Sequence, residues 1–551
     1  HAAAPFAAGM KLSEEAQREE SRSLYDQALS AYVARDFAAA DRYLQALQAL
    51  TGGRSLPSLL LSAYLARDRG QPLSEIRLLQ QAIELYEGDA HVPLRLLATA
   101  WSLLGAALSY LGESAMASAA FRKAARLEPN RDQKLVECSN AIFTANAVET
   151  LTAVEMQGIY REYRELLVDV SPWPRRWYDH RRLRIGYLSG DFGLHPVAYF
   201  AYALLRYFQP EIFQVYCYAV NQHEDLLTER LKRLPVIWRD TRTKDWEEAA
   251  AAVRADEIDI LVDLSGHTAG NCLPVFAYQP AAVQLSGIGY MNSTGLSNVD
   301  GFLSDVYCAP KAADPFFTEP LLRLPQTHLC YTRPHAFPEV VDKPPSKRSG
   351  YVTFGCFNNF SKVTDGMLSL WQKILERTPG ARLLLKHKIF DSEEGRAYAD
   401  GRLRQAGLDR SRVEYRGFSA DYLAEYNDID VALDTAPYTG GLTTCEALYM
   451  GVPVVSLTGR RHGARFGYSL LHNVGVGDLA AATPEAYVET AAALAAAPET
   501  LTGLRRVLRP MMARSPLMDG RGYARAVEEM YQRVYAACRG RAEGKRRGRR
   551  G

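Results

Sequence analysis

A histidine at position 195 lies in a sequence context that suits proton transfer. The segment from Gly186 to Pro196 has the pattern of a strand end followed by a glycine-rich loop, and His195 stands near the end of that loop. Ligands of open α/β sheets bind beyond the carboxyl ends of the strands, where this loop would lie. An imidazole, whose unperturbed pKa is about 6.5, can accept a proton from an attacking hydroxyl group. The competing interpretation is a histidine that satisfies only the loop backbone.

A lysine after a later predicted strand suits the binding of a diphosphate. The loop 357–362 ends at Lys362 and also contains Asn358 and Asn359. An ammonium group with amides beside it can hold the charge of a diphosphate as it leaves. The loop therefore predicts a phosphate contact.

The segment 434–446 predicts a second phosphate contact. A glycine pair precedes Thr443 and Thr444 at the start of a predicted helix. Free backbone amides and the positive end of the helix dipole favour phosphate there, and Glu446, one turn on, could accept hydrogen bonds from ribose hydroxyls. The alternative is ordinary helix capping by Thr443 or Thr444.

An uncharged stretch suggests a binding surface for a neutral polar ligand. Leu264 to Val299 contains no Asp, Glu, Lys or Arg, yet it is rich in Gly, Asn, Gln, Ser and Thr. Such a segment suits buried loops that contact a sugar. Plain packing of loops in the core is the alternative.

These segments follow strands that alternate with helical patterns from about residue 183 onward. A Pro/Lys/Ser-rich stretch at 344–349 separates two such series, which predicts two doubly wound parallel sheets facing each other across a cleft, with a hinge near 340–350. The predicted strands are 183–188, 213–220, 258–264, 283–288 and 299–304 in the first series, and 351–356, 381–386, 412–415, 429–433 and 452–457 in the second.

The first third of the chain has the pattern of a helical repeat. One unit matches the tetratricopeptide repeat signature, with Leu108 where Tyr is usual, and its signature residues are Trp101, Leu104, Gly105, Leu108, Ala117, Phe121, Ala124 and Pro129. Weaker copies are indicated by Ala40, Leu44 and Leu47 and by Leu79 and Ala82. A short right-handed stack is expected, and it serves either as a scaffold or as a concave surface for a peptide. The apolar run from Leu96 to Gly112 is then a repeat helix rather than a membrane span.

Composition and charge exclude several classes of protein. With 47% hydrophobic and 23% charged residues among 551, the chain is neither disordered nor fibrous. The segment 539–551 carries +6 and is expected to be a disordered, solvated end, with an anchor to an anionic surface as the alternative. The rest of the chain carries −4, so no nucleic-acid partner is expected. Eight scattered cysteines without a CxxC pair and no recognisable secretory signal favour the cytoplasm. GxGxxG, GxxxxGK[ST] and HExxH motifs are absent from the sequence.

Together, the motifs at 186–196, 264–272, 357–362 and 434–446 and the repeats before them resemble the O-linked N-acetylglucosamine transferase family. The resemblance runs from residue 183 to about 535, with a shortened repeat array. It implies a GT-B fold of two Rossmann-like lobes and metal-independent inverting transfer of a sugar from a nucleotide donor to Ser or Thr of intracellular proteins.

The resemblance also implies roles for individual residues. His195 corresponds to the active-site histidine, as base or as a positioning group, and Lys362 to the lysine that binds the diphosphate. The other implied contacts are an amide beside the diphosphate at Asn359, the phosphates at Thr443 and Thr444, the ribose at Glu446, the uracil ring at Tyr422, the base edge at the Gly417 backbone, and the sugar or acceptor pocket at His267, Gly289 and Tyr290.

Three positions depart from the family pattern and affect the expected donor. Leu442 stands where animal members have His, Met291 where they have Pro, and His267 where they have Tyr. The sugar and acceptor pockets are therefore expected to differ from those of the animal members.

The sequence thus predicts five segments: repeats at 12–130, a helical linker at 131–182, an N-terminal lobe at 183–345, a C-terminal lobe with a terminal helix at 346–538, and a basic tail at 539–551. The predicted function is transfer of N-acetylglucosamine from UDP-N-acetylglucosamine to Ser or Thr of a protein, releasing UDP, without a cofactor, metal or membrane span. The alternatives are a protein O-fucosyltransferase using GDP-fucose, a protein N-glucosyltransferase, and an interaction scaffold with a degenerate transferase lobe.

Overall fold

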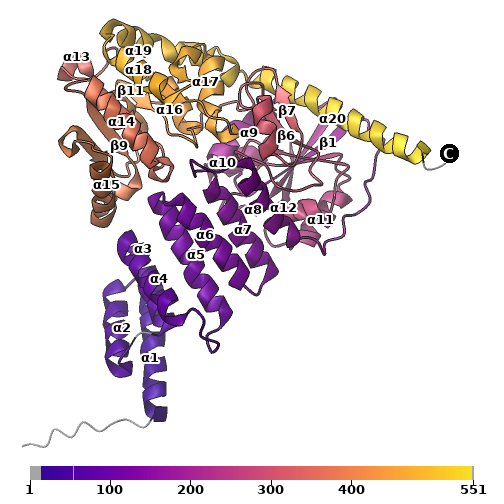
Figure 1. Ribbon diagram of the computed structural model, residues 1–551. Coiled ribbons are helices and arrows are strands. Elements are labelled where there is room, and N and C mark those ends of the chain that lie inside the picture. Colours follow the sequence, from indigo (N-terminus) through magenta and orange to yellow (C-terminus); the bar gives the residue numbers. More distant parts are fainter. Residues whose placement is uncertain (1–13, 54, 549–551) are drawn as a thin grey trace, which may run out of the picture.

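A helical array lies beneath two α/β lobes in the computed structural model, which describes residues 14–53 and 55–548 (Figure 1). The helices of the array stack side by side in chain order. They are α1 (Glu14–Val33), α2 (Phe37–Thr51), α3 (Leu56–Asp68), α4 (Pro72–Tyr86), α5 (Leu94–Leu111), α6 (Ser114–Leu127), α7 (Arg131–Ala145) and α8 (Ala153–Glu165).

The predicted repeat residues pack as the pattern requires. A Cβ at Gly105 would lie 2.9 Å from the ring of Phe121, so the glycine lets α5 and α6 approach closely. Ala40 in α2 and Leu79 in α4 are buried in the two earlier hairpins. The stack continues beyond the predicted boundary at residue 130, because α7 packs on α6 and α8 packs on α7.

Helix α5 is the one described helix that is long and apolar enough to cross a bilayer by length and composition alone. Half of Leu94–Leu111 is buried inside the protein. Its burial against the neighbouring repeat helices accounts for the apolar run.

The N-terminal lobe is a parallel sheet of order β3-β2-β1-β4-β5-β6-β7. Ile185 of β1 lies between Val215 of β2 and Ile260 of β4. The strands are β1 (Leu183–Ser189), β2 (Phe213–Ala219), β3 (Ile237–Asp240), β4 (Ile260–Asp263), β5 (Val283–Gly287), β6 (Gly301–Asp305) and β7 (Leu321–Leu324). Its α-helices are α9 (Pro196–Arg206), α10 (Leu226–Lys232), α11 (Trp246–Ala255) and α12 (Leu273–Ala277).

The C-terminal lobe is a second parallel sheet, of order β10-β9-β8-β11-β12-β13. Its strands are β8 (Thr353–Cys356), β9 (Arg382–Lys386), β10 (Val413–Arg416), β11 (Val431–Leu433), β12 (Val454–Leu457) and β13 (Ala480–Ala481). Its α-helices are α13 (Ser346–Ser349), α14 (Asp365–Arg377), α15 (Glu393–Gln405), α16 (Leu442–Tyr449), α17 (Phe466–Val474), α18 (Pro484–Ala495) and α19 (Pro498–Ala513), and the short 3-10 helices η2 (Phe360–Lys362) and η5 (Tyr422–Asp428) follow β8 and β10.

The ten predicted strands are all present, within a few residues of their predicted bounds, and the predicted fold class is confirmed. The strands β3, β7 and β13, each at the edge of a sheet, were not predicted. One continuous apolar core joins the two lobes and reaches Tyr160 of α8, and a second lies on the other side of the C-terminal sheet and includes Leu111 of α5.

The terminal helix α20 (Gly520–Gly548) corrects two predictions. It crosses from the C-terminal lobe back over the N-terminal lobe (Figure 1), where Tyr531 contacts Tyr187 hydroxyl to hydroxyl at 3.1 Å. It therefore packs on the lobe opposite to the one predicted. The helix also continues to residue 548, so 539–548 is not the disordered end that was expected. Arg539, at the start of this segment, pairs with Asp179 at 2.8 Å. Residues 549–551 lie outside the described part.

The chain crosses between the lobes at two adjacent places. The first crossing follows β7, and the second leads into α20. The Tyr331 amide of the first donates to the Leu517 carbonyl of the second at 2.7 Å, and the Tyr523 hydroxyl donates to the His328 carbonyl at 2.8 Å.

Candidate functional site

His195 is the N-cap residue of α9, directly after the loop that leaves β1. Its Nδ1 atom accepts a hydrogen bond from the Val197 amide at 3.4 Å and lies 3.7 Å from the Asp191 carboxylate. Burial raises the pKa of Asp191. When Nδ1 accepts from Val197, a neutral ring carries its proton on Nε2, whereas a proton on Nδ1 facing Asp191 leaves Nε2 free to accept. With 45% of its side chain exposed, His195 is open to a substrate.

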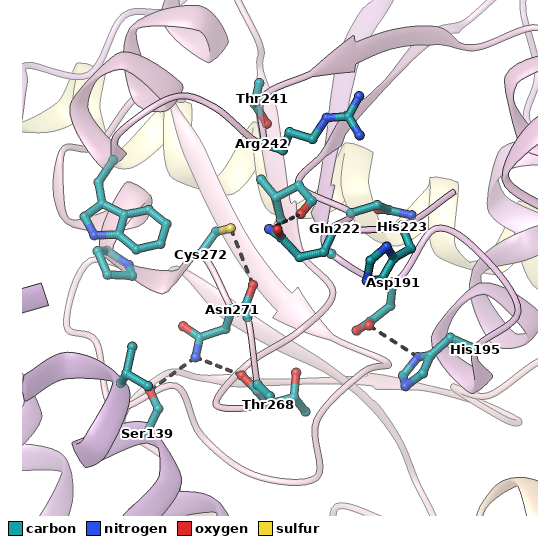
Figure 2. Close-up of a pocket in the computed structure, with 18 of the residues that line it drawn as sticks. Ser139, Asp191, His195, Gln222, His223, Thr241, Arg242, Thr268, Asn271 and Cys272 are labelled. Carbon is teal, nitrogen blue, oxygen red and sulfur yellow. Dashed lines mark hydrogen bonds and ion pairs between the residues drawn. The ribbon is translucent and has the colours of Figure 1, made fainter. Parts of the chain in front are cut away.

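A cavity of about 580 Å³ lies between the repeat helices and the N-terminal lobe, and His195 lines it. Figure 2 shows His195 and Asp191 on one side, and Ser139, Thr268 and Asn271 together at another. The lining comes from α7, α8 and the loops after β1, β2, β3 and β4, and it includes Asp132, Ser139, Asn140, Tyr163, Asn221, Gln222, His223, Arg242, Lys244 and Trp246. Apolar side chains such as Leu135, Leu194 and Pro274 complete the lining, and this combination of polar, charged and apolar groups suits a peptide segment.

His267 lies behind this cavity rather than on its surface. Its Nδ1 atom contacts the Ser139 hydroxyl at 2.9 Å, and its Nε2 atom contacts the Thr294 carbonyl at 2.8 Å. Burial lowers the pKa of His267 to about 4, so the ring is neutral near pH 7. The side chain therefore ties α7 to the uncharged loops, while its neighbours Thr268 and Asn271 reach the cavity.

Gly289 and Tyr290 lie in the same uncharged loops. A Cβ at Gly289 would lie 1.6 Å from the Leu264 carbonyl oxygen, so only glycine allows the two loops to meet. Tyr290 is buried, and its hydroxyl accepts a hydrogen bond from Asn146 at 2.9 Å. Tyr290 therefore contacts the repeat array, whereas Gly289 lies against Leu264 and Val197 within the N-terminal lobe.

Lys362 ends η2 in the C-terminal lobe. Its Nζ atom lies 3.7 Å from the centroid of the Tyr438 ring, a cation–π contact. Burial lowers the pKa of Lys362 to about 8, against the opposing effect of the Asp434 carboxylate. Asn359 begins the same turn, and its side chain accepts a hydrogen bond from the Ser361 amide at 3.1 Å.

Asp434 organises the loop before α16, a role that the sequence analysis missed. Its buried carboxylate accepts hydrogen bonds from the Gly440 amide at 2.8 Å, the Ser456 hydroxyl at 2.7 Å and Asn358 Nδ2 at 3.2 Å. Burial raises its pKa. An acidic residue directly after a buried strand was the available signal for this position.

The start of α16 leaves its backbone amides available. Gly441 is the N-cap residue and no side chain caps the helix, so the alternative of capping by Thr443 or Thr444 is wrong. The Thr443 hydroxyl instead donates to Asn358 Oδ1 at 2.8 Å, and the Thr444 hydroxyl donates to the Gly440 carbonyl at 3.1 Å. The first amides of a helix have no intrahelical partner and favour an anion.

Glu446, one turn into α16, is a buried carboxylate between two tyrosines. The Tyr422 hydroxyl donates to it at 2.5 Å and the Tyr426 hydroxyl at 3.4 Å. Burial raises the pKa of Glu446 to about 7. Burial and the Glu446 carboxylate together raise the pKa of Tyr199, which lies one turn after His195.

Gly417 directly follows β10. Its carbonyl accepts a hydrogen bond from Lys386 Nζ at 2.8 Å. A Cβ there would lie 1.7 Å from Asp391 Oδ1, which explains the need for glycine.

The predicted residues thus fall into two neighbouring regions. His195 lines the large cavity, whose lining does not include Lys362, Thr443 or Thr444 among the described residues. Thr443 and Thr444, with Asn358, line a narrow hollow of about 20 Å³ in the C-terminal lobe. Phe143 of α7 contacts Tyr438 with ring centroids 6.5 Å apart, which connects the two regions.

The two other departures from the family pattern occupy different positions. Leu442 is the first residue of α16, beside the threonine pair. The Met291 carbonyl contacts His462 Nδ1 at 3.1 Å, so this backbone holds a loop of the C-terminal lobe.

One group within residues 14–53 and 55–548 has the spacing of metal ligands. It consists of Cys308, His328 and His462, all buried between the lobes. His462 Nε2 contacts the Ser304 hydroxyl at 2.8 Å, and His328 Nδ1 contacts the Asp305 carboxylate at 2.5 Å. These hydrogen bonds account for the cluster within the protein.

Comparison with known proteins gives consistent matches. Residues 172–349 and 344–527 match the family model described as Glycosyl transferase family 41. The probable UDP-N-acetylglucosamine–peptide N-acetylglucosaminyltransferase SPINDLY of Solanum lycopersicum is 38% identical over 383 residues, covering 68% of this chain and 41% of that protein. The corresponding SEC protein of Arabidopsis thaliana is 28% identical over 369 residues, covering 64% of this chain and 37% of its own length. The chain thus spans about two fifths of the length of these relatives.

A solved structure resembles nearly the whole chain. It is a mutant of the O-GlcNAc transferase of Thermobaculum terrenum, with a TM-score of 0.81 and 30% sequence identity. The match covers 96% of this chain and 99% of that one, so it includes the helical array as well as both lobes.

Proposed function

Because this chain belongs to glycosyltransferase family 41, we propose that it transfers a sugar from a nucleoside diphosphate to a hydroxyl group of a protein. UDP-N-acetylglucosamine is the first candidate donor, and Ser or Thr is the candidate acceptor. The names of the related proteins support the choice of donor and of a protein acceptor.

One observation carries the proposal: a lysine and an uncapped helix start both lie beside the loop 434–441. The Asn358 side chain accepts a hydrogen bond from Thr443 and donates one to Asp434. Lys362 lies over the ring of Tyr438, a residue of the loop between Asp434 and α16. In the proposed reaction, the Lys362 ammonium and the first amides of α16 hold the diphosphate. They stabilise the charge that develops on the leaving oxygen, which is a role that metal ions fill in other transferases, so we propose transfer without a metal or cofactor.

The nucleoside is proposed to lie beside Glu446 and Tyr422. The Glu446 carboxylate accepts hydrogen bonds from tyrosine hydroxyls, and ribose hydroxyls offer the same chemistry. The Tyr422 ring would pack against the base, and the backbone of Gly417 would face its edge. Asn359 would contribute an amide contact near the diphosphate.

His195 is proposed to act on the acceptor hydroxyl. With its Nδ1 proton directed at Asp191, the ring accepts the hydroxyl proton at Nε2 as the hydroxyl attacks the sugar from the face opposite the diphosphate. With Nδ1 accepting from Val197, the ring instead donates through Nε2 and positions the substrate. Both roles require an exposed imidazole.

The acceptor is proposed to enter through the cavity between the repeat helices and the N-terminal lobe. That cavity is open to His195 and offers amide, hydroxyl and charged side chains to a peptide. The shape of the sugar pocket would follow from Gly289 and Tyr290, with His267 acting through Thr268. A cytoplasmic location belongs to the same proposal, since the implied acceptors are intracellular proteins.

Isothermal titration calorimetry with UDP and GDP tests the donor site. We expect UDP to bind and Lys362→Ala to weaken binding by tenfold or more, on the order of 1.4 kcal/mol or above. Unchanged UDP affinity in Lys362→Ala would refute the phosphate role. Preference for GDP would point to the fucose donor, and nucleotide binding without turnover of any donor in the presence of protein acceptors would favour the scaffold alternative.

A further inference from the structure

The turn between α5 and α6 lies directly on the loop that carries Lys362. Leu111, the last residue of α5, shares a buried apolar cluster with Phe360 of η2. A Cβ at Gly112 would lie 3.2 Å from both the Cα and the carbonyl oxygen of Ser361, and Gly112 has φ +87°. Glycine is needed here both for the left-handed backbone and for the close approach to the loop.

A second contact runs from α7 to the ammonium itself. The rings of Phe143 and Tyr438 are perpendicular, at 83°, with centroids 6.5 Å apart. Lys362 Nζ lies 3.7 Å from the centroid of the same Tyr438 ring. The orientation of Tyr438 is therefore set on one side by a repeat helix, while Lys362 lies against the ring.

A third contact lies just after Lys362. The Thr364 hydroxyl, which caps α14, donates to Glu149 Oε1 at 2.5 Å, and Glu149 follows α7. The repeat array thus contacts Ser361 before the lysine, Thr364 after it, and the Tyr438 ring against which the lysine lies.

We propose that Gly112 and Phe143 are positioning residues for the Lys362 ammonium, so that the repeat array forms part of the donor site as well as a wall of the acceptor cavity. This inference rests on the proposed function. A lysine side chain is long and loses considerable rotamer entropy when it is held in one place. Holding its loop and its aromatic support in advance reduces that loss when a diphosphate binds.

Binding of UDP to Phe143 variants tests the inference. Phe143→Ala frees the Tyr438 ring, and we expect UDP affinity to fall by about two- to thirty-fold, the range of a cation–π contact. Phe143→Leu keeps apolar bulk without the ring and should lose most of the same affinity, whereas Phe143→Tyr should restore it. The KM for the acceptor peptide should change less than the KM for the donor.

The pH dependence of UDP binding gives a readout that general destabilisation does not move. In the wild type, the affinity for UDP should fall as the pH rises, with a midpoint at about pH 8, because Lys362 loses its proton there. A loosened loop admits water, so the midpoint in Phe143→Ala and Gly112→Ala should move toward the ordinary lysine pKa of 10.5.

Met116→Ala is the matched control, since Met116 is an exposed apolar residue of α6. It should leave both the affinity and the midpoint unchanged. The inference would be overturned if Phe143→Leu and Gly112→Ala bound UDP with the affinity and the pH midpoint of the wild type while Lys362→Ala still weakened UDP binding. If Lys362→Ala itself left UDP affinity unchanged, the proposed function would be overturned instead.

Discussion

The hydroxyl of Tyr422 donates a 2.5 Å hydrogen bond to the buried carboxylate of Glu446. This pair joins η5 to α16. Glu446 is 4% exposed, and its hydrogen-bond partners in the described part of the chain are neutral tyrosine hydroxyls, so a charge on the carboxylate is costly near neutral pH.

Glu446→Gln should therefore stabilise the fold at high pH while weakening nucleoside binding. Burial raises the pKa of Glu446 from 4.5 to about 7, so the folded protein keeps a proton that the unfolded chain has already lost. The contribution to stability is full below pH 4.5 and is lost as the pH rises through about 7. We expect the free energy of unfolding to rise by up to about 3 kcal/mol at pH 8 and to change little at pH 4.5.

Urea unfolding at both pH values measures this effect. Glu84→Gln, at an exposed position of α4, is the control and should change stability at neither pH. Equal effects of Glu446→Gln at pH 4.5 and pH 8 would contradict the assignment of the cost to the ionised carboxylate.

Lys362→Arg should remove the pH dependence of UDP binding between pH 7 and 10. The Lys362 ammonium loses its proton at about pH 8, whereas a guanidinium keeps its charge throughout this range. Wild-type affinity should fall above pH 8, with proton uptake on binding that calorimetry in buffers of different ionisation enthalpy detects. A wild-type affinity that is flat over this range would show that another group holds the phosphates.

His195→Ala should lower turnover by about 10²-fold or more while leaving UDP affinity unchanged. The imidazole faces the acceptor cavity and does not contact the C-terminal loops described above. His195→Gln separates the two roles, because an amide can position a hydroxyl but does not accept its proton. Retention of most activity in His195→Gln would favour positioning, and an unaltered rate in His195→Ala would discard any catalytic role.

Gly289→Ala should destabilise the protein strongly. A methyl group there would lie 1.6 Å from the Leu264 carbonyl oxygen, so the backbone of two loops would have to move. We expect a loss of roughly 2–4 kcal/mol in thermal unfolding. Gly158→Ala is the matched control, because a Cβ at Gly158 in α8 meets no atom within 4 Å and alanine favours a helix.

The sequence predicted the buried parts of the fold well and the edges poorly. Central strands such as Ile260–Asp263 are apolar runs buried on both faces, and their composition identifies them. The edge strand Ile237–Asp240 is partly exposed and half charged, and Ala480–Ala481 has two residues, so neither produces a recognisable pattern. The helix over 539–548 places Arg539 beside Asp179, which lies 360 residues away in the chain, and no local pattern indicates this contact.

The same distinction holds within the site. His195, Lys362 and Thr443 could be proposed because each belongs to a local motif near a strand or helix end. The partnership of Asn358 with Asp434, and of Phe143 with Tyr438, joins residues far apart in the sequence. A single sequence carries no signal for such pairs, because each member by itself has the composition of an ordinary loop or helix.

The two crossings between the lobes are joined by the bond from the Tyr331 amide to the Leu517 carbonyl, so they form a double connection. The apolar core that continues from one lobe into the other adds a further constraint. Any change in the angle between the lobes would therefore have to carry both crossings together.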